Sequence, residues 1–381
     1  MLLKAYMIRK FVLTICCVLC CVVCLVSCVS DKVGNSSATL KMHYASLLSI
    51  EEADSFTIVK VADPWHKQRT MASYVLVPKS QSLPLNMPHG EVVRTPIERS
   101  TLTSAVHMSL MLDLGTEQYI AGVTDTAYVV STKIKNYLRL HKDIKNMGTS
   151  MSPNLELMKY VQCDAVFVSP FENADYSAFN KSKLTLVQCA DYMETSPLGR
   201  AEWMRFYGRL FGKAASADSL FDSVEKNYLL LKDMVKKGRD KCPSVMCDLR
   251  TGNIWYQPGG KSTMGQFIND AGARYLWADN KDSGSLPLGI ENVLMRGSKA
   301  DIWLVKYGQS DNLTYKQMQQ DYLPYTQVKA WKKHRIWACN TMKTAFYEEV
   351  PFHPERLLKN LIHIFHPDVV SSSDDYYIPM K

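Results

Sequence analysis

Residues 152–168 read SPNLELMKYVQCDAVFV, and residues 287–305 read PLGIENVLMRGSKADIWLV. Each stretch places a glutamate in the early turns of a short predicted helix, then an aspartate, then an apolar run typical of a buried strand. The order helix, aspartate, strand is common, so one copy would mean little. Two copies far apart in one chain predict two related α/β halves.

A long helical segment separates the two copies. Trp203, Phe206, Tyr207, Leu210 and Phe211 fall at i, i+3, i+4, i+7 and i+8, the spacing of one helix face. An ordinary surface helix of a single domain would give the same pattern, but the position between two similar halves favours a connecting helix. We therefore expect an N-terminal lobe at 41–198, a connecting helix at 199–238 and a C-terminal lobe at 239–381.

Short apolar strands alternate with helices along the rest of the chain, which is the pattern of layered α/β folds. Helices are predicted at 100–114 and 153–161, and residues 41–88 are interpreted as a first hairpin of the N-terminal lobe. The predicted strands are Thr57–Val61, Ser73–Val77, Tyr119–Val123, Asp164–Ser169, Leu184–Gln188, Ser244–Leu249, Asp301–Lys306 and Arg335–Cys339. The expected fold is α/β, with two three-layer α/β lobes joined by a single long backbone helix and a ligand cleft between the lobes.

The N-terminus has the layout of an export signal. Three basic residues precede an uncharged apolar stretch, Phe11–Val26, which ends in Leu25-Val26-Ser27-Cys28. This ending resembles a bacterial lipobox, in which the cysteine thiol accepts the lipid, so we expect a signal peptide at 1–27, lipidation of Cys28 and a polar tether at 28–40. The alternative is an uncleaved membrane anchor, for which the apolar run is short. Under both interpretations the rest of the chain is exported. No acidic run, of the kind that resembles a surface-export signal, follows Cys28, which favours the periplasmic side.

Charge and cysteine usage exclude some classes of function. The formal net charge is +8, and removal of Lys4, Arg9 and Lys10 leaves 8 − 3 = +5 on the mature chain, without the dense Lys/Arg blocks of nucleic-acid binders. Five of the eleven cysteines remain beyond Cys28, an odd number that cannot all pair, and no CxxC spacing indicates zinc. His363 and His366 with Asp368 could form a metal pair, but they are more typical of a wet helix end. We predict no metal site and no catalytic residue.

The order of these stretches resembles the periplasmic substrate-binding proteins of ABC importers for iron–siderophores, haem and vitamin B12. The resemblance runs from about Arg99 to Pro367. The matching stretches are residues 99–115, 120–124, 154–156, 163–167, 258–262 with 270–273, and Glu291 with 300–303. It implies a binding lipoprotein with no intrinsic cofactor, partnered by an ABC permease and ATPase.

Aromatic and basic residues at predicted strand–helix loops are the candidate ligand contacts. Flat aromatic faces suit a macrocycle or an aromatic chelate, and basic groups suit its carboxylates. Any single ring could instead cap the core. The candidates are Arg99, Phe171, Tyr192, Trp255, Tyr256, Lys261 and Trp277. The glycines at 259–260 do not form a phosphate loop, because the first glycine of that motif would fall at Trp255.

The ligand expected from the resemblance is an iron chelate or haem. Vitamin B12 binders of this family flank the corrin with aromatic residues at two loops. The corresponding loops here read Gly148-Thr149-Ser150 and Leu286-Pro287-Leu288, and neither has an aromatic side chain. A cobalamin-binding member, a chelatase-like or hydrolytic α/β enzyme, and a structural surface lipoprotein are the alternatives. The resemblance also assigns one acidic residue per lobe to permease docking, and Glu156 and Glu291 match those positions.

Overall fold

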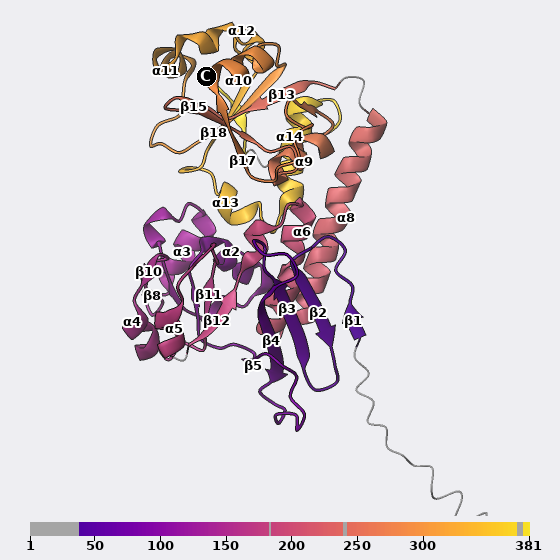
Figure 1. The fold of residues 1–381 in the computed structure, drawn as a ribbon. Helices are drawn as coiled ribbons and strands as arrows, with labels where there is room; N and C mark the ends of the chain where they lie inside the picture. Colours follow the sequence, from indigo (N-terminus) through magenta and orange to yellow (C-terminus); the bar gives the residue numbers. More distant parts are fainter. Residues whose placement is uncertain (1–37, 183, 239–241, 372–375) are drawn as a thin grey trace, which may run out of the picture. The chain divides into compact units, whose positions relative to one another are not determined.

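The computed structural model describes residues 38–182, 184–238, 242–371 and 376–381, and Figure 1 traces these elements. Two parallel sheets form the centres of two lobes. The N-terminal sheet has the order β12 (Thr185–Gln188), β11 (Ala165–Val168), β6 (Ser100–Leu102), β7 (Ile120–Val123) and β8 (Lys145–Asn146). The C-terminal sheet has the order β16 (Arg274–Tyr275), β13 (Ser244–Cys247), β18 (Ile302–Tyr307), β19 (Ile336–Asn340) and β20 (Ile378–Pro379), with β20 antiparallel. The predicted α/β class is confirmed.

The repeated helix–aspartate–strand unit has the same structural role in both lobes. Asp164 stands just before β11, and its Oδ2 accepts the backbone N–H of Arg99 at 3.2 Å, at the start of the neighbouring strand β6. Asp301 stands just before β18, and its Oδ2 accepts the N–H of Ser244 at 2.8 Å, at the start of the neighbouring strand β13. The same carboxylate clamp thus joins the starts of two neighbouring parallel strands in each sheet.

The predicted helix at 100–114 is wrong in its first residues. Ser100–Leu102 form β6, a central strand that pairs with β7 and β11, and the helix α2 (Ala105–Leu114) begins after the N-cap Ser104. Three residues are too few to show a period of two, so tertiary pairing rather than local pattern defines this strand.

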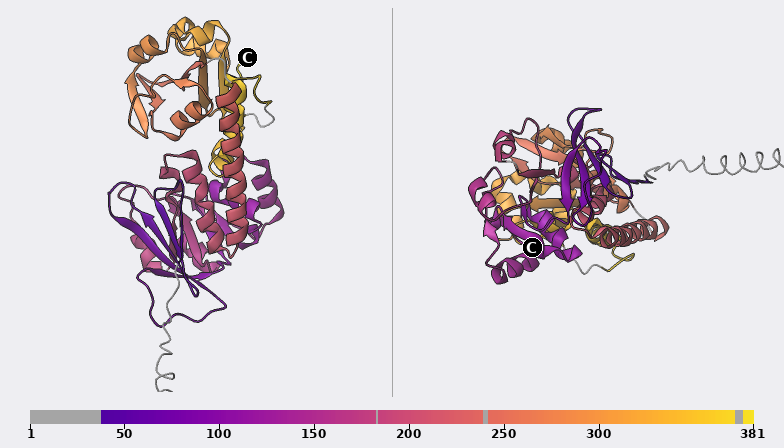
Figure 2. Two further views of the ribbon diagram at one scale, coloured as in Figure 1. Left: turned by 90° about the vertical axis from the view of Figure 1, so that its right-hand side faces the viewer. Right: turned by 90° about the horizontal axis from the view of Figure 1, so that it is seen from below.

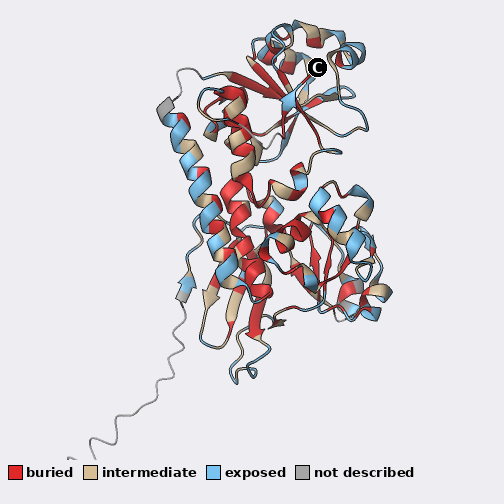
Figure 3. Cartoon of the chain, turned by 180° about the vertical axis from the view of Figure 1, so that it is seen from behind, coloured by how far each residue is buried: buried red, intermediate tan, exposed pale blue. Residues whose placement is uncertain are grey.

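The connecting segment consists of three helices, α6 (Pro197–Glu202), α7 (Met204–Leu210) and α8 (Ala214–Gly238). The chain turns at Gly212, whose φ of 67° favours glycine. The predicted aromatic face is buried throughout, including Trp203, Phe206 and Tyr207. Figures 1 and 3 show the 25-residue α8 reaching from one lobe to the other with its outer face exposed.

A second link between the lobes was not predicted. After β19, the chain forms α13 (Phe346–Glu349), which packs on α2 of the N-terminal lobe, and then α14 (Pro354–Phe365), which packs along α8 and α9 (Thr263–Asp270). The Glu348 carboxylate accepts the backbone N–H groups of Val130 and Ser131 at 2.6 and 2.5 Å. Figure 2 shows α14 beside α8. The single backbone helix is therefore only one of two ties between the lobes.

Residues 38–95 form a five-stranded sheet rather than the expected hairpin. Its strands follow chain order: β1 (Ala38–Leu40), β2 (Leu48–Glu52), β3 (Thr57–Ala62), β4 (Thr70–Pro78) and β5 (Glu91–Thr95), antiparallel except for β4 and β5. The carboxylates of Glu194 and Glu202 accept the backbone N–H groups of residues 43–47. These long-range bonds attach the sheet to the N-terminal lobe, and no local pattern could reveal them.

Smaller elements complete the described chain. They are α3 (Thr132–Leu140), β9 (Gly148–Thr149), β10 (Ser152–Pro153), α4 (Leu155–Tyr160), α5 (Ser177–Ser182), β14 (Arg250–Thr251), β15 (Ile254–Pro258), β17 (Ser285–Gly289), α10 (Ile290–Gly297), α11 (Tyr315–Asp321), α12 (Lys329–Lys332), and the 3₁₀ turns at 117–119, 126–128, 190–193 and 323–327. Among the described residues, no helix combines the length and apolar character needed to cross a membrane.

Candidate functional site

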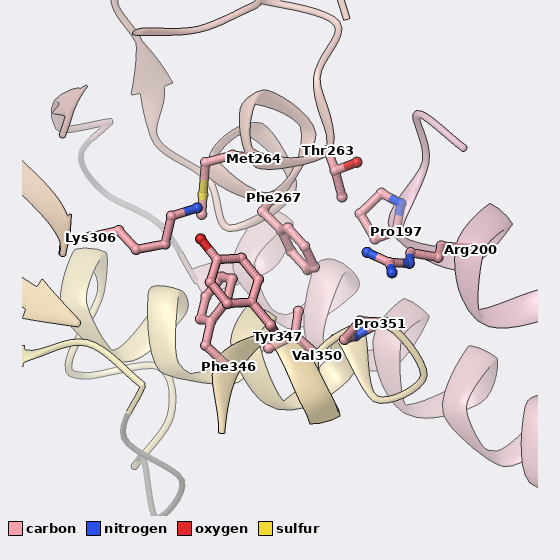
Figure 4. A pocket seen from close by; sticks show the side chains of 10 residues that line it. All are labelled: Pro197, Arg200, Thr263, Met264, Phe267, Lys306, Phe346, Tyr347, Val350 and Pro351. Atoms are coloured by element: carbon pink, nitrogen blue, oxygen red, sulfur yellow. The ribbon is translucent and has the colours of Figure 1, made fainter. Parts of the chain in front are cut away.

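A cavity of about 150 Å³ lies between the helices that tie the lobes and the carboxyl end of the C-terminal sheet (Figure 4). One wall comes from α6, one from the start of α9, and one from α13 and the residues that follow it. The lining residues are Pro197, Arg200, Thr263, Met264, Phe267, Lys306, Phe346, Tyr347, Val350 and Pro351. Carboxyl ends of parallel strands are the usual place for ligands in α/β folds, and this cavity conforms to that rule.

Lys306 supplies a positive charge to the cavity from the end of β18. Its ammonium lies 5.2 Å from the ring centroid of Phe346 and 5.3 Å from that of Tyr347, within the range of cation–π attraction. Burial alone would lower the pKa of Lys306, but the neighbouring carboxylate of Asp248 and the Tyr347 hydroxyl outweigh burial and raise it. Lys306 is therefore cationic at neutral pH.

Arg200 supplies a second positive charge from α6. Its Nε donates to Asp191 Oδ2 at 3.0 Å, while Asp191 Oδ1 accepts from Tyr207 Oη at 2.8 Å and lies 3.1 Å from His107 Nε2. Burial would raise the pKa of Asp191, but Arg200, His107 and Tyr207 outweigh burial and lower it to about 2. The ionised carboxylate holds Arg200 in place, and the Arg200 side chain, which lines the cavity, remains a quarter exposed.

The cavity is otherwise apolar, and direct contacts between the lobes close one side. Phe267, Phe346 and Val350 give it hydrophobic surface. Gln266 Nε2 donates to the carbonyl of Thr195 at 2.7 Å, which joins α9 to the segment before α6. Such a site favours a ligand with an aromatic or apolar body and negatively charged edges.

Three of the predicted ligand residues lie away from any cleft. Arg99 donates from Nε to the carbonyl of Val161 at the amino end of β6, opposite the edge where a ligand would bind. Trp255 is 0% exposed and packs against Trp303 and Tyr325 inside the C-terminal lobe. Trp277 is also buried. These three predictions are corrected. Trp255 and Trp277 point into the core rather than toward a ligand, and Arg99 lies at the wrong edge of the sheet.

The other four predicted residues reach the surface but do not line this cavity. Tyr256 is exposed on β15, and Lys261 is exposed in the turn before α9. Phe171 lines a separate cavity, described below, and Tyr192 donates its hydroxyl to the carbonyl of Pro170. Their part in ligand binding stays a prediction.

The residues that do line the cavity were missed for identifiable reasons. Lys306 ends a predicted strand, and a lysine closing an apolar run was a signal that could have been followed. Arg200 is one of several basic residues on the connecting segment, so nothing local distinguishes it. Phe346 and Tyr347 lie in the second link between the lobes, which the pattern did not reveal.

The predicted docking glutamates are exposed and equivalently placed. Glu156 lies in α4 with its side chain 87% exposed, and Glu291 lies in the first turn of α10 and is also exposed. Each stands on the helix that leads to the clamping aspartate of its lobe. Their contact with a permease stays a prediction. Cys28, the predicted lipid attachment point, lies outside the described residues.

The histidines near the C-terminus serve the fold. His363 Nδ1 lies 3.0 Å from the carbonyl of Val370, and His366 Nε2 lies 3.2 Å from that of Gly272. Within the part of the chain that the structure describes, no three His, Cys, Asp or Glu side chains gather in a way that could hold a metal ion.

Comparison with known proteins gives the family. A lipoprotein of Methanocaldococcus jannaschii is 23% identical over 304 residues, covering 75% of this chain and 69% of that protein. An ABC-type Fe³⁺-hydroxamate transport protein from Saccharomonospora viridis superposes with a TM-score of 0.55 at 18% identity, over 71% of this chain and 94% of that one. IsdE of Staphylococcus aureus, solved with haem, superposes with a TM-score of 0.54 at 18% identity, over 70% of this chain and 98% of that one. These two structures share the fold. A family model described as periplasmic binding protein matches residues 101–341, well over half of the sequence, and the chain belongs to that family.

Proposed function

We propose that the chain is the substrate-binding lipoprotein of an ABC importer and that it captures an anionic iron chelate, a siderophore or haem, outside the cytoplasmic membrane. The ligand class is inferred from the cavity beside Lys306 and Arg200. Two cations on an aromatic and aliphatic surface match a ligand with an apolar body and acidic groups. The two structural relatives, a hydroxamate transport protein and a protein solved with haem, support iron as the cargo.

The size of the cavity limits how such a ligand would bind. Its volume of about 150 Å³ is below the roughly 300–1,000 Å³ of pockets that enclose drug-sized ligands. A chelate would therefore place its acidic edge against Lys306 and Arg200 and extend out of the mouth of the cavity. Cobalamin, the larger alternative within the class, has no observation in its favour here.

Delivery would involve an inner-membrane permease and its ATPase. In this proposal lipid on Cys28 keeps the protein at the membrane, and Glu156 and Glu291 meet basic residues of the permease. The lipoprotein named among the relatives supports the anchor. The protein itself would carry no intrinsic cofactor and catalyse no reaction.

The test is a titration of purified protein with haem, ferric hydroxamates, ferric catecholates and cobalamins, followed by tryptophan fluorescence. Trp255 and Trp303 both donate from Nε1 to the carbonyl of Asp248, at 3.1 and 2.9 Å, and Trp303 lies on the same strand as Lys306. A strongly absorbing ligand in the cavity should quench them. Lys306→Met should weaken binding at least tenfold, because a charge-assisted contact is worth about 1.5–3 kcal/mol.

Matched variants separate the cavity from the rest of the surface. Lys316→Met removes an exposed lysine of α11, outside the cavity, and should bind like the wild type. Tyr347→Ala, which changes a half-exposed ring on α13, should weaken binding without unfolding the protein. If no iron compound alters the fluorescence, or if Lys316→Met and Lys306→Met behave alike, the proposed ligand class is wrong.

A further inference from the structure

A second cavity, of about 250 Å³, lies where the β1–β5 sheet meets the N-terminal lobe. The loop between β3 and β4 supplies one wall, and the residues after β11 with the end of β12 supply the other. Its lining is Asp63, Trp65, His66, Arg69, Met71, Phe171 with its neighbours at 170–174, Tyr176 and Gln188. The first wall precedes the part of the chain that the family model matches, so the family assigns it no role.

Two polar atoms at this cavity are buried without a partner. Gln188 Oε1 and the Tyr176 hydroxyl are both shielded from solvent, and neither meets a hydrogen-bonding group among the described residues. Leaving a buried polar group unpaired costs roughly 1–3 kcal/mol. Both atoms lie behind the accessible surface of the cavity, so a ligand would recover that cost once the Gln188 and Tyr176 side chains rotate to meet it.

The charged residues of the loop are already arranged. Asp63 Oδ1 accepts the backbone N–H groups of Trp65 and His66 at 2.8 and 3.0 Å, and its Oδ2 lies 3.4 Å from Arg69 Nε. The carboxylate thus holds the guanidinium by one edge and neutralises its charge. The Arg69 side chain is 66% exposed and lines the cavity, so its other N–H groups can turn toward a ligand.

Aromatic surface completes the site. Phe171 is 49% exposed, unusual for a phenylalanine, and it lies in the same lining as Trp65. Polarised C–H groups of a saturated ring pack well on such faces. At about 30 Å³ per water, the cavity has the volume of roughly eight water molecules, enough for one substituted six-membered ring.

We propose that this cavity binds a polyhydroxylated ring, either a free monosaccharide or a sugar carried as a substituent on a chelate. Hydroxyl groups both donate and accept, so one ring can satisfy Gln188 Oε1, accept from Arg69 and face Phe171. A simple anion fits less well, because Asp63 and Glu172 offset the positive charge. The β1–β5 sheet is then a recognition element added to the family fold.

The second cavity lies close to the first without sharing a residue. Tyr192 donates its hydroxyl to Pro170 of the second cavity, and the adjacent Asp191 holds Arg200 of the first. Binding in the second cavity therefore does not require the proposed chelate to bind in the first. The two proposals fail independently.

Saturation-transfer NMR of the full chain with glucose, N-acetylglucosamine and myo-inositol tests the site. A second series compares a ferric catecholate with its glucosylated form by tryptophan fluorescence. Gln188→Leu and Trp65→Ala should each weaken sugar binding about tenfold. Tyr176→Phe, which keeps the ring and the fold, should weaken it less, and Tyr256→Ala, an exposed tyrosine of the other lobe, should leave it unchanged.

The two series identify the source of the ring. If free sugars show saturation transfer that Gln188→Leu removes, the site takes a monosaccharide. If Gln188→Leu instead weakens only the glucosylated chelate, the ring belongs to the cargo. The proposal is overturned if neither series responds to Gln188→Leu, whatever Lys306→Met does to chelate binding in the first cavity.

Discussion

His353 is a single side chain that joins the two lobes. Its Nε2 lies 3.0 Å from Asp113 Oδ2 in α2, and its Nδ1 lies 3.2 Å from Glu355 Oε1 at the start of α14. Burial would lower the pKa of His353, but Asp113 and Glu355 outweigh burial and raise it to about 9. The imidazole is therefore protonated at neutral pH and forms two charge-assisted bonds.

This raised pKa predicts how stability changes with pH. A group that holds its proton more tightly when folded stabilises the protein fully below its unfolded pKa, about 6.5 for histidine, and loses that contribution as pH rises through the folded value near 9. The midpoint of thermal unfolding should fall between pH 6.5 and 9.5, by an amount worth at most about 3 kcal/mol. His353→Gln should show a shallower decline, measured by circular dichroism in the same buffers. Parallel curves for the two proteins would refute this role.

At the scale of elements, α4 and α10 present matching surfaces. Each carries an exposed glutamate and, four residues later on the same helix face, a large exposed apolar side chain: Tyr160 is 80% exposed and Met295 is 76% exposed. Tyrosine and methionine are enriched at protein interfaces, and the rims of such interfaces are polar. The two surfaces lie one on each lobe, as a two-fold permease would require.

The prediction for these helices concerns transport rather than ligand binding. Glu156→Lys combined with Glu291→Lys should abolish uptake in cells that carry the transporter, because reversed charges repel a basic partner. Ligand affinity of the purified variant should stay within about twofold, since neither residue lines a cavity. Asp54→Lys with Asp368→Lys makes the same change of charge at exposed positions on other elements, and uptake should survive it. Normal transport by the glutamate double variant would exclude these helices as docking points.

At the scale of the whole protein, two ties limit the motion of the lobes. The helix α8 runs between them, and α13 with α14 returns from the C-terminal lobe to contact α2 and α6. Hinge bending would have to disrupt both ties at once, including the bonds from Glu348 to the backbone before α3. A single crossing helix would leave more freedom.

We therefore expect ligand binding to change the distance between the lobes very little. Small-angle scattering of the apo and ligand-bound protein should give radii of gyration within about 1 Å of each other. The variant Glu348→Ala with His353→Ala loosens the second tie and should show a larger change. A compaction of several ångströms in the wild type would show that the ties permit a hinge.

The sequence by itself determined the repeated unit, most of the strands and the buried aromatic face of the connecting segment. Each of these depends on a local period or on a short run of apolar residues, which neighbouring positions are enough to display. The strands Ala165–Val168 and Ile302–Tyr307 were predicted correctly because they are buried on both faces in their first residues. The family resemblance followed from the order of these elements.

The tertiary structure alone decided which side chains form the cavities. Arg200, Lys306 and Tyr347 come from three distant elements, and only packing brings them together. The same holds for the sheet at 38–95, fixed by Glu194 and Glu202 more than 140 positions away. Whether a tryptophan faces a ligand or the core, as at Trp255 in β15, depends on neighbours that are remote in sequence. A local sequence pattern holds no information about such contacts, because they join residues that are far apart in the chain.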